Sequence, residues 1–186
     1  MLKARLVSGL LAIALATMSS LYAVPAHAAS AAELNRDASA VMGKLYEKHP
    51  EAKTLNAKAK AVLIFPSIYK AGFMLGAQYG EGVLRKGNKT VGYYNTVAAS
   101  YGLQAGAQAF GYALFFMNDG ALSYLDKSGG FEVGVGPSIV VLDEGAAKSM
   151  TSSTLTQDIY ALIFDQKGLM GGLGLQGSKI SKIDKK

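Results

Sequence analysis

The spacing of hydrophobic residues changes once along this chain, near residue 61. Before that point, apolar residues recur at intervals of three and four, which predicts an amphipathic helix over Ala31–Lys48 with a stripe of Leu34, Ala38, Val41 and Leu45. Ser30 followed three residues later by Glu33 predicts a capping box at the start of this helix. Because proline disfavours helical geometry in the residue before it, His49-Pro50 should end this helix, and Pro50 should start a second one that runs to about Lys60.

After residue 61 the pattern becomes short apolar runs separated by glycine, which is typical of strands. The first run should end at Pro66, residues 86–89 should form a turn, and Asn118 should cap an inserted helix over residues 120–127. Helices followed by strands favour an α+β fold with a curved, largely antiparallel, partly closed sheet of about seven strands. The runs of strand-forming residues from which about seven strands are expected lie at 61–65, 72–80, 81–86, 90–95, 101–108, 112–117, 131–142, 154–164 and 169–182.

The first 28 residues have the order of parts found in a secretory signal peptide. Lys3 and Arg5 precede an uncharged apolar run over residues 6–18, and Ala26-His27-Ala28 is a small-x-small cleavage site. A membrane anchor fits less well, because the apolar run is short and diluted by serine and threonine. We therefore expect cleavage near Ala28 and an exported protein, periplasmic or peripherally attached to the envelope. Residues 29–60 and 61–186 should then form one folded unit, a helical region joined to a β-rich region.

The composition leaves little for catalysis. The chain has 186 residues, no Cys and two His, and cleavage would leave only His49, which we expect in an exposed loop. These counts exclude disulfides, thiolate chemistry and cysteine lipidation, and they disfavour a serine triad. Residues 172–177 match G-x-G-x-x-G, but too few residues follow for a nucleotide-binding unit. We predict no catalytic residues, no metal site and no cofactor, although a pair of carboxylates that meet in space stays open.

The charge distribution points to an anionic partner. The formal net charge is +6, or +4 without Lys3 and Arg5, and no acid separates Glu51 from Glu81. This asymmetry favours a membrane surface or a polyanion, and export disfavours nucleic acid. Apolar residues near the basic ones, at Ile68, Tyr69, Phe73 and Met74, favour binding at a membrane interface, whereas the alternative is a plain solvated surface. The candidate lipid-binding residues are Lys53, Lys58, Lys60, Lys70, Arg85, Lys86 and Lys89.

Several ordered motifs within residues 61–183 resemble the SYLF-domain family. They are AVLIFPSIYKAGFMLGAQYGEGVL at 61–84, the G-x-Q-x-G segment within 101–108, a G-x-G-P element at 134–137 and a K-G-L-x-x-G segment at 167–172. This resemblance implies phospholipid binding, with phosphoinositides favoured among eukaryotic members and actin filaments linked to some fungal ones. For an exported bacterial member, anionic bacterial phospholipids are the natural substitute.

The leading hypothesis is a non-enzymatic protein of the cell envelope that binds anionic phospholipid through basic and apolar side chains. Two alternatives stay open, a small outer-membrane β-barrel and a structural protein of the envelope. An enzyme is a third and weaker one. Any protein partner is unknown.

Overall fold

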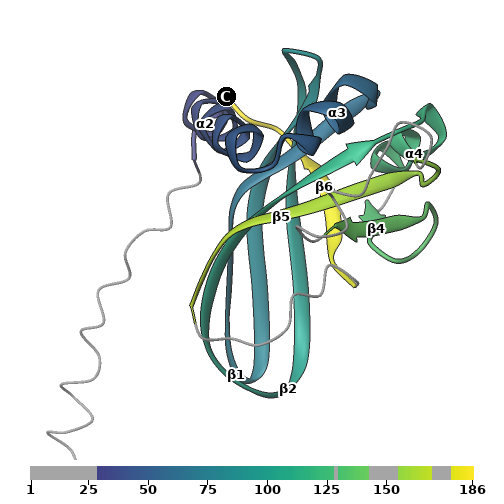
Figure 1. Ribbon diagram of the computed structural model, residues 1–186. Coiled ribbons are helices and arrows are strands. Elements are labelled where there is room, and N and C mark those ends of the chain that lie inside the picture. Colours follow the sequence, from purple (N-terminus) through teal and green to yellow (C-terminus); the bar gives the residue numbers. More distant parts are fainter. Residues whose placement is uncertain (1–28, 128–129, 143–154, 169–176) are drawn as a thin grey trace, which may run out of the picture.

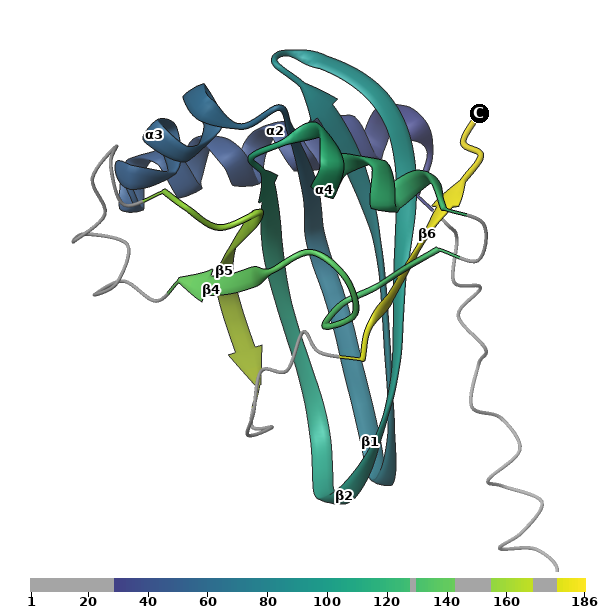
Figure 2. The same ribbon diagram turned by 90° about the vertical axis from the view of Figure 1, so that its right-hand side faces the viewer.

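The computed structural model describes residues 29–127, 130–142, 155–168 and 177–186, and it confirms the α+β class. Two helices precede a curled sheet, and a short helical insertion follows the second strand, as Figures 1 and 2 show. The described elements are α2 (Ala31–Lys48), α3 (Glu51–Lys58), β1 (Ala61–Lys86), β2 (Lys89–Phe116), α4 (Asp119–Ser123), η2 (Tyr124–Asp126), β3 (Phe131–Glu132), β4 (Ile139–Leu142), β5 (Ile159–Gly168) and β6 (Lys179–Ile183).

The helical region agrees closely with the sequence prediction. The Ser30 hydroxyl accepts from the Glu33 N–H, and the Glu33 carboxylate accepts from the Ser30 N–H, so the capping box is confirmed. Pro50 is the N-cap of α3. The buried stripe of α2 uses Met42 where the periodicity predicted Val41, which is half-buried against the same core.

The two longest elements, β1 and β2, form one long antiparallel ribbon. Pairing runs from Ala61 opposite Phe116 to Lys86 opposite Lys89, so the predicted turn at 86–89 is confirmed. Midway, each strand turns back on itself, and the ribbon forms two limbs (Figure 1). The predicted short strands are therefore segments of two long ones. The prediction that Pro66 ends the first strand is wrong, because Pro66 is buried within β1 at a register irregularity that spares it a ladder hydrogen bond.

Glycine allows the two limbs of β1 to touch. A Cβ built on Gly80 would lie 2.5 Å from Ile68 Cγ1, and one built on Gly82 would lie 2.7 Å from Phe65 Cδ1. Real side chains do not approach so closely, so these glycines fix the tight curl of the sheet.

The remaining strands widen this ribbon into a mixed sheet. β5 and β6 each pair antiparallel with β2, β3 pairs antiparallel with β6, and β4 runs parallel to β5. The parallel pair was not predicted. The predicted strand at 131–142 is split into β3 and β4 by a turn in which Gly134 and Gly136 have positive φ. Part of the predicted last strand, 169–176, lies outside the described residues.

The ribbon separates two hydrophobic cores. Ala61, Leu63 and Phe65 face one core with Phe131 and Ile180, whereas Val62 and Ile64 face the core covered by α2 and α3. This alternation is what a strand buried on both faces requires.

The inserted helix begins where it was predicted and ends early. The Asn118 side chain accepts from the Ala121 N–H, but α4 stops at Ser123 and continues as the 3-10 helix η2. Asn118 also donates to Asp158 Oδ1 at 2.8 Å, while the Ser138 N–H and hydroxyl donate to Oδ2 at 3.0 Å. These donors, the Ser138 N–H first, hold the pKa of Asp158 below its usual value and tie the insertion to β4 and β5.

Candidate functional site

Three of the predicted lipid-binding residues lie on or just after α3. Ala52 and Leu55 face the core, which leaves Lys53 and Lys58 on the exposed side of this short helix. Lys60 is also exposed, and its backbone N–H donates to the Phe116 carbonyl at 2.8 Å where the ribbon begins. The three lysines are thus held by a rigid part of the fold.

Two more predicted residues, Lys86 and Lys89, form the tip of the β1–β2 hairpin. They face each other in the pairing register, are exposed, and are joined through Gly87 with a φ of 57°. Both views in Figures 1 and 2 place this tip, α2 and α3 at the same end of the molecule. Here the lysine end means Lys53, Lys58, Lys60, Lys86 and Lys89.

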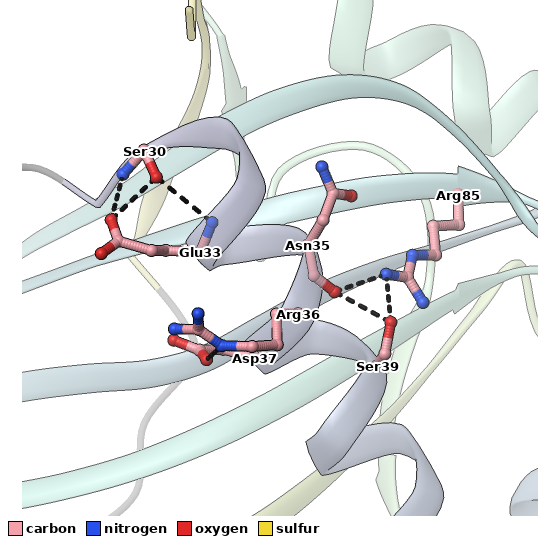
Figure 3. Close-up of polar contacts among 7 residues, drawn as sticks. All are labelled: Ser30, Glu33, Asn35, Arg36, Asp37, Ser39 and Arg85. Carbon is pink, nitrogen blue, oxygen red and sulfur yellow. Dashed lines mark hydrogen bonds and ion pairs between the residues drawn. The ribbon is translucent and has the colours of Figure 1, made fainter.

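Arg85 makes hydrogen bonds within the protein and is not fully exposed to solvent. Its Nη2 donates to the Asn35 carbonyl and to the Ser39 hydroxyl of α2, each at 2.8 Å (Figure 3). Thr90 and Tyr93 reach the Asn35 side chain from β2. The guanidinium therefore fastens α2 to the ribbon, and the half-buried Arg85 is less suited to a headgroup than its exposed neighbour Lys86.

Lys70 lies apart from the other predicted residues. It is half-buried and stands two positions before Gly72, where β1 turns back at the end of the ribbon opposite the helices (Figure 1). The sequence grouped Lys70 with Lys60 because both lie in the acid-free stretch between Glu51 and Glu81. A strand running away from the helices separates them.

A buried ion pair closes the helical end. Lys185 Nζ lies 2.6 Å from Glu81 Oε2 and donates to the Ala29 carbonyl at 2.7 Å, and the two charged side chains are only 8% and 11% exposed. Tyr79 donates to the other Glu81 oxygen at 2.9 Å. Burial, together with this bond and the carboxylate charge, raises the pKa of Tyr79 to about 12. The sequence did not predict this ion pair, because Glu81 is 104 positions from Lys185.

A shallow groove beside β6 was also not predicted from the sequence. It has a volume of about 460 Å³ and is lined by Asp126, Lys127, Lys179 and Lys182 among others, and a smaller depression connects Lys182 with Lys86. Two of its cations already have partners, since Lys182 lies 4.0 Å from Asp126 and Lys127 lies over the Tyr124 ring at 3.3 Å. Burial first, then the charge of Asp126 and a hydrogen bond to it, raises the pKa of Tyr94 to about 12. The groove lies outside the lysine end and is not counted as part of it.

The prediction that His49 is exposed is wrong. This residue, the only histidine of residues 29–186, is largely buried. His49 caps α2, its side chain is 12% exposed, and its Nδ1 lies 3.2 Å from Glu51 Oε1. Within the described residues, His, Asp and Glu form no group of three or more that could hold a metal ion. No helix in that part of the chain is both long and apolar enough to cross a bilayer.

Comparison with known families gives one finding. A family model, "Ysc84: Las17-binding protein actin regulator", matches residues 97–186. The SYLF resemblance is thereby confirmed for that part of the chain, while the motif at 61–84 precedes the matched residues. The curated proteins contain no match.

Proposed function

We propose that this chain, whose residues 97–186 match the Ysc84 (SYLF) family model, is a non-enzymatic protein that binds anionic phospholipid surfaces. The observation that carries the proposal is the lysine end, where two segments about thirty positions apart bring five exposed cations to one end of a rigid fold.

The physical basis is electrostatic attraction. A lysine near an anionic bilayer contributes about 1 kcal/mol, and several contributions on one rigid body add to useful affinity. Lysine ammonium groups on flexible stems suit phosphate oxygens as point charges and do not need a shaped pocket. Such a surface agrees with peripheral attachment, and it would work at the envelope if the predicted signal segment directs export.

The family description names Las17 binding and actin regulation, so a protein filament is the competing partner. We place lipid first because an exported chain would meet membrane surfaces before cytoplasmic filaments. Co-sedimentation with actin filaments is therefore the counter-test, and we expect the chain to stay in the supernatant.

The test is co-sedimentation with vesicles of phosphatidylglycerol and, for comparison, phosphatidylcholine. We expect binding to the anionic vesicles that weakens as salt rises, because salt screens exposed charges. Replacing all five lysines of the lysine end with glutamine should weaken it on the order of a thousandfold.

The control removes exposed lysines from other strands, Lys167→Gln with Lys179→Gln, and should change binding little. Equal binding to both lipids, or an unchanged affinity after the five substitutions, would overturn the proposal.

A further inference from the structure

The end of the ribbon opposite the helices is nearly free of charge and exposes large apolar side chains. Here the distal bend means residues 69–77 of β1 and their partner stretch, residues 99–109 of β2. Lys70 is its single charged residue, and no carboxylate occurs in residues 62–80 or 82–118. Tyr69 is 66% exposed and Leu75 is 63% exposed.

Glycine builds this bend. A Cβ on Gly72 would collide with the Leu75 carbonyl oxygen and the Gly76 backbone, and Gly106, opposite Gly72, has a φ of 144°. Only glycine accepts both the close approach and this φ. The turn therefore has a defined shape, with Tyr69 before it on one limb and Leu75 just after it on the other.

We propose that the distal bend enters the apolar layer of a lipid bilayer. This rests on the proposed lipid binding and adds a second contact to it, one that is apolar rather than electrostatic. Exposed leucine gains free energy on leaving water, and tyrosine suits the boundary between hydrocarbon and headgroups. Lys70 has a long stem that can extend its ammonium group back to phosphate.

A bilayer fits this surface better than a second copy of the chain does. The turn of the bend, around Gly72 and Gly106, extends past the ends of β5 and β6, whose pairing with β2 stops at Gln108 and at Val97, as Figures 1 and 2 show. It is therefore a narrow tip. Stable protein interfaces need about 800 Å² of complementary surface from each partner. A narrow tip of this kind can insert into a lipid bilayer more readily than it can form a protein interface of that size. The absence of carboxylates also removes the groups that an anionic surface would repel.

The chain contains no Trp, so a single introduced Trp reports its own surroundings. Leu75→Trp places the probe in the distal bend, and Val91→Trp places a matched probe beside the hairpin tip at an exposed valine. Both are mixed with phosphatidylglycerol vesicles whose acyl chains carry bromine at a known depth. We expect the Leu75→Trp emission to shift to the blue and to be quenched by bromine, and the Val91→Trp emission to stay unquenched.

A loss-of-function pair completes the test. Leu75→Ser with Tyr69→Ser should lower the attachment that persists at high salt on the order of tenfold, whereas Val141→Ser, at another exposed apolar position, should not. Circular dichroism verifies that each variant is folded.

Three results would overturn the inference: unquenched Leu75→Trp emission while the protein is vesicle-bound, unchanged attachment after the serine substitutions, or a blue shift that follows protein concentration without vesicles. The last result would assign the bend to a second copy. The lysine substitutions leave the bend intact, so failure of the proposed function is distinguishable from failure of this inference.

Discussion

The two ends of the β1–β2 ribbon are stabilised by different interactions. At the helical end, polar side chains hold the elements together: Arg85 donates to α2, and Lys185 forms an ion pair with Glu81. Exposed lysines lie on the outer surface of this end. At the distal bend, glycine fixes the backbone, and tyrosine and leucine are exposed. The contrast shows that one continuous strand pair carries clustered lysines at one end and exposed apolar side chains at the other.

The largest expected effect comes from using both ends together. Since they lie at opposite ends of the molecule, one molecule bound by both would join two bilayers. We expect the protein to cluster phosphatidylglycerol vesicles at low salt, as measured by dynamic light scattering. Substituting the lysine end or the distal bend should abolish the clustering. If either variant still clustered vesicles, the claim that one molecule joins two bilayers through its two ends would be wrong.

The next largest effect concerns the stability of the helical end. Glu81→Gln leaves the buried Lys185 ammonium without its counter-charge, which should lower the free energy of unfolding by about 3 kcal/mol. Urea denaturation measures the loss. Lys186→Gln, at the exposed neighbour, is the control and should change little. A Glu81→Gln protein as stable as the parent would refute the role of this ion pair.

Substitutions of the adjacent residues Arg85 and Lys86 should have opposite effects on stability and on vesicle binding. Arg85→Gln should lower the free energy of unfolding by about 2 kcal/mol, because it removes charged hydrogen bonds to α2, and should leave vesicle affinity unchanged. Lys86→Gln should do the reverse and weaken vesicle binding about fivefold without loss of stability. Denaturation and co-sedimentation of both variants decide the matter. If Arg85→Gln alone weakened binding, the guanidinium would belong to the lipid contact.

The smallest effect separates two kinds of glycine. Gly43 lies on the exposed side of α2 with nothing near its missing Cβ, so Gly43→Ala should stabilise the protein by about 0.5–1 kcal/mol. Gly82→Ala should destabilise it instead, because the new methyl group meets the Phe65 ring and the Ile64 carbonyl. Thermal unfolding compares them, and a stabilising Gly82→Ala would contradict the close packing of the two limbs.

Local features were predictable from the sequence, because each depends on residues a few positions apart. The Ser30–Glu33 capping box, the turn between Lys86 and Lys89 and the Asn118 cap are of this kind. The bend at Gly72 was missed because a glycine in a strand does not reveal what approaches it. The roles of Arg85 and Lys185 were missed because Asn35 and Glu81 are 50 and 104 positions away. Lys70 was grouped with the lysine end because nearness in the sequence does not show that a strand carries it to the other end of the molecule.

If the lysine end binds lipid as proposed, the position of the lysines matters, and not only the net charge. Two double variants of equal charge test it most directly, Lys86→Gln with Lys89→Gln, and Lys167→Gln with Lys179→Gln. Their affinities for phosphatidylglycerol vesicles are measured side by side at low salt. We expect about a thirtyfold loss of affinity for the hairpin pair and almost none for the other pair. Equal losses for both, or none for the hairpin pair, would contradict it.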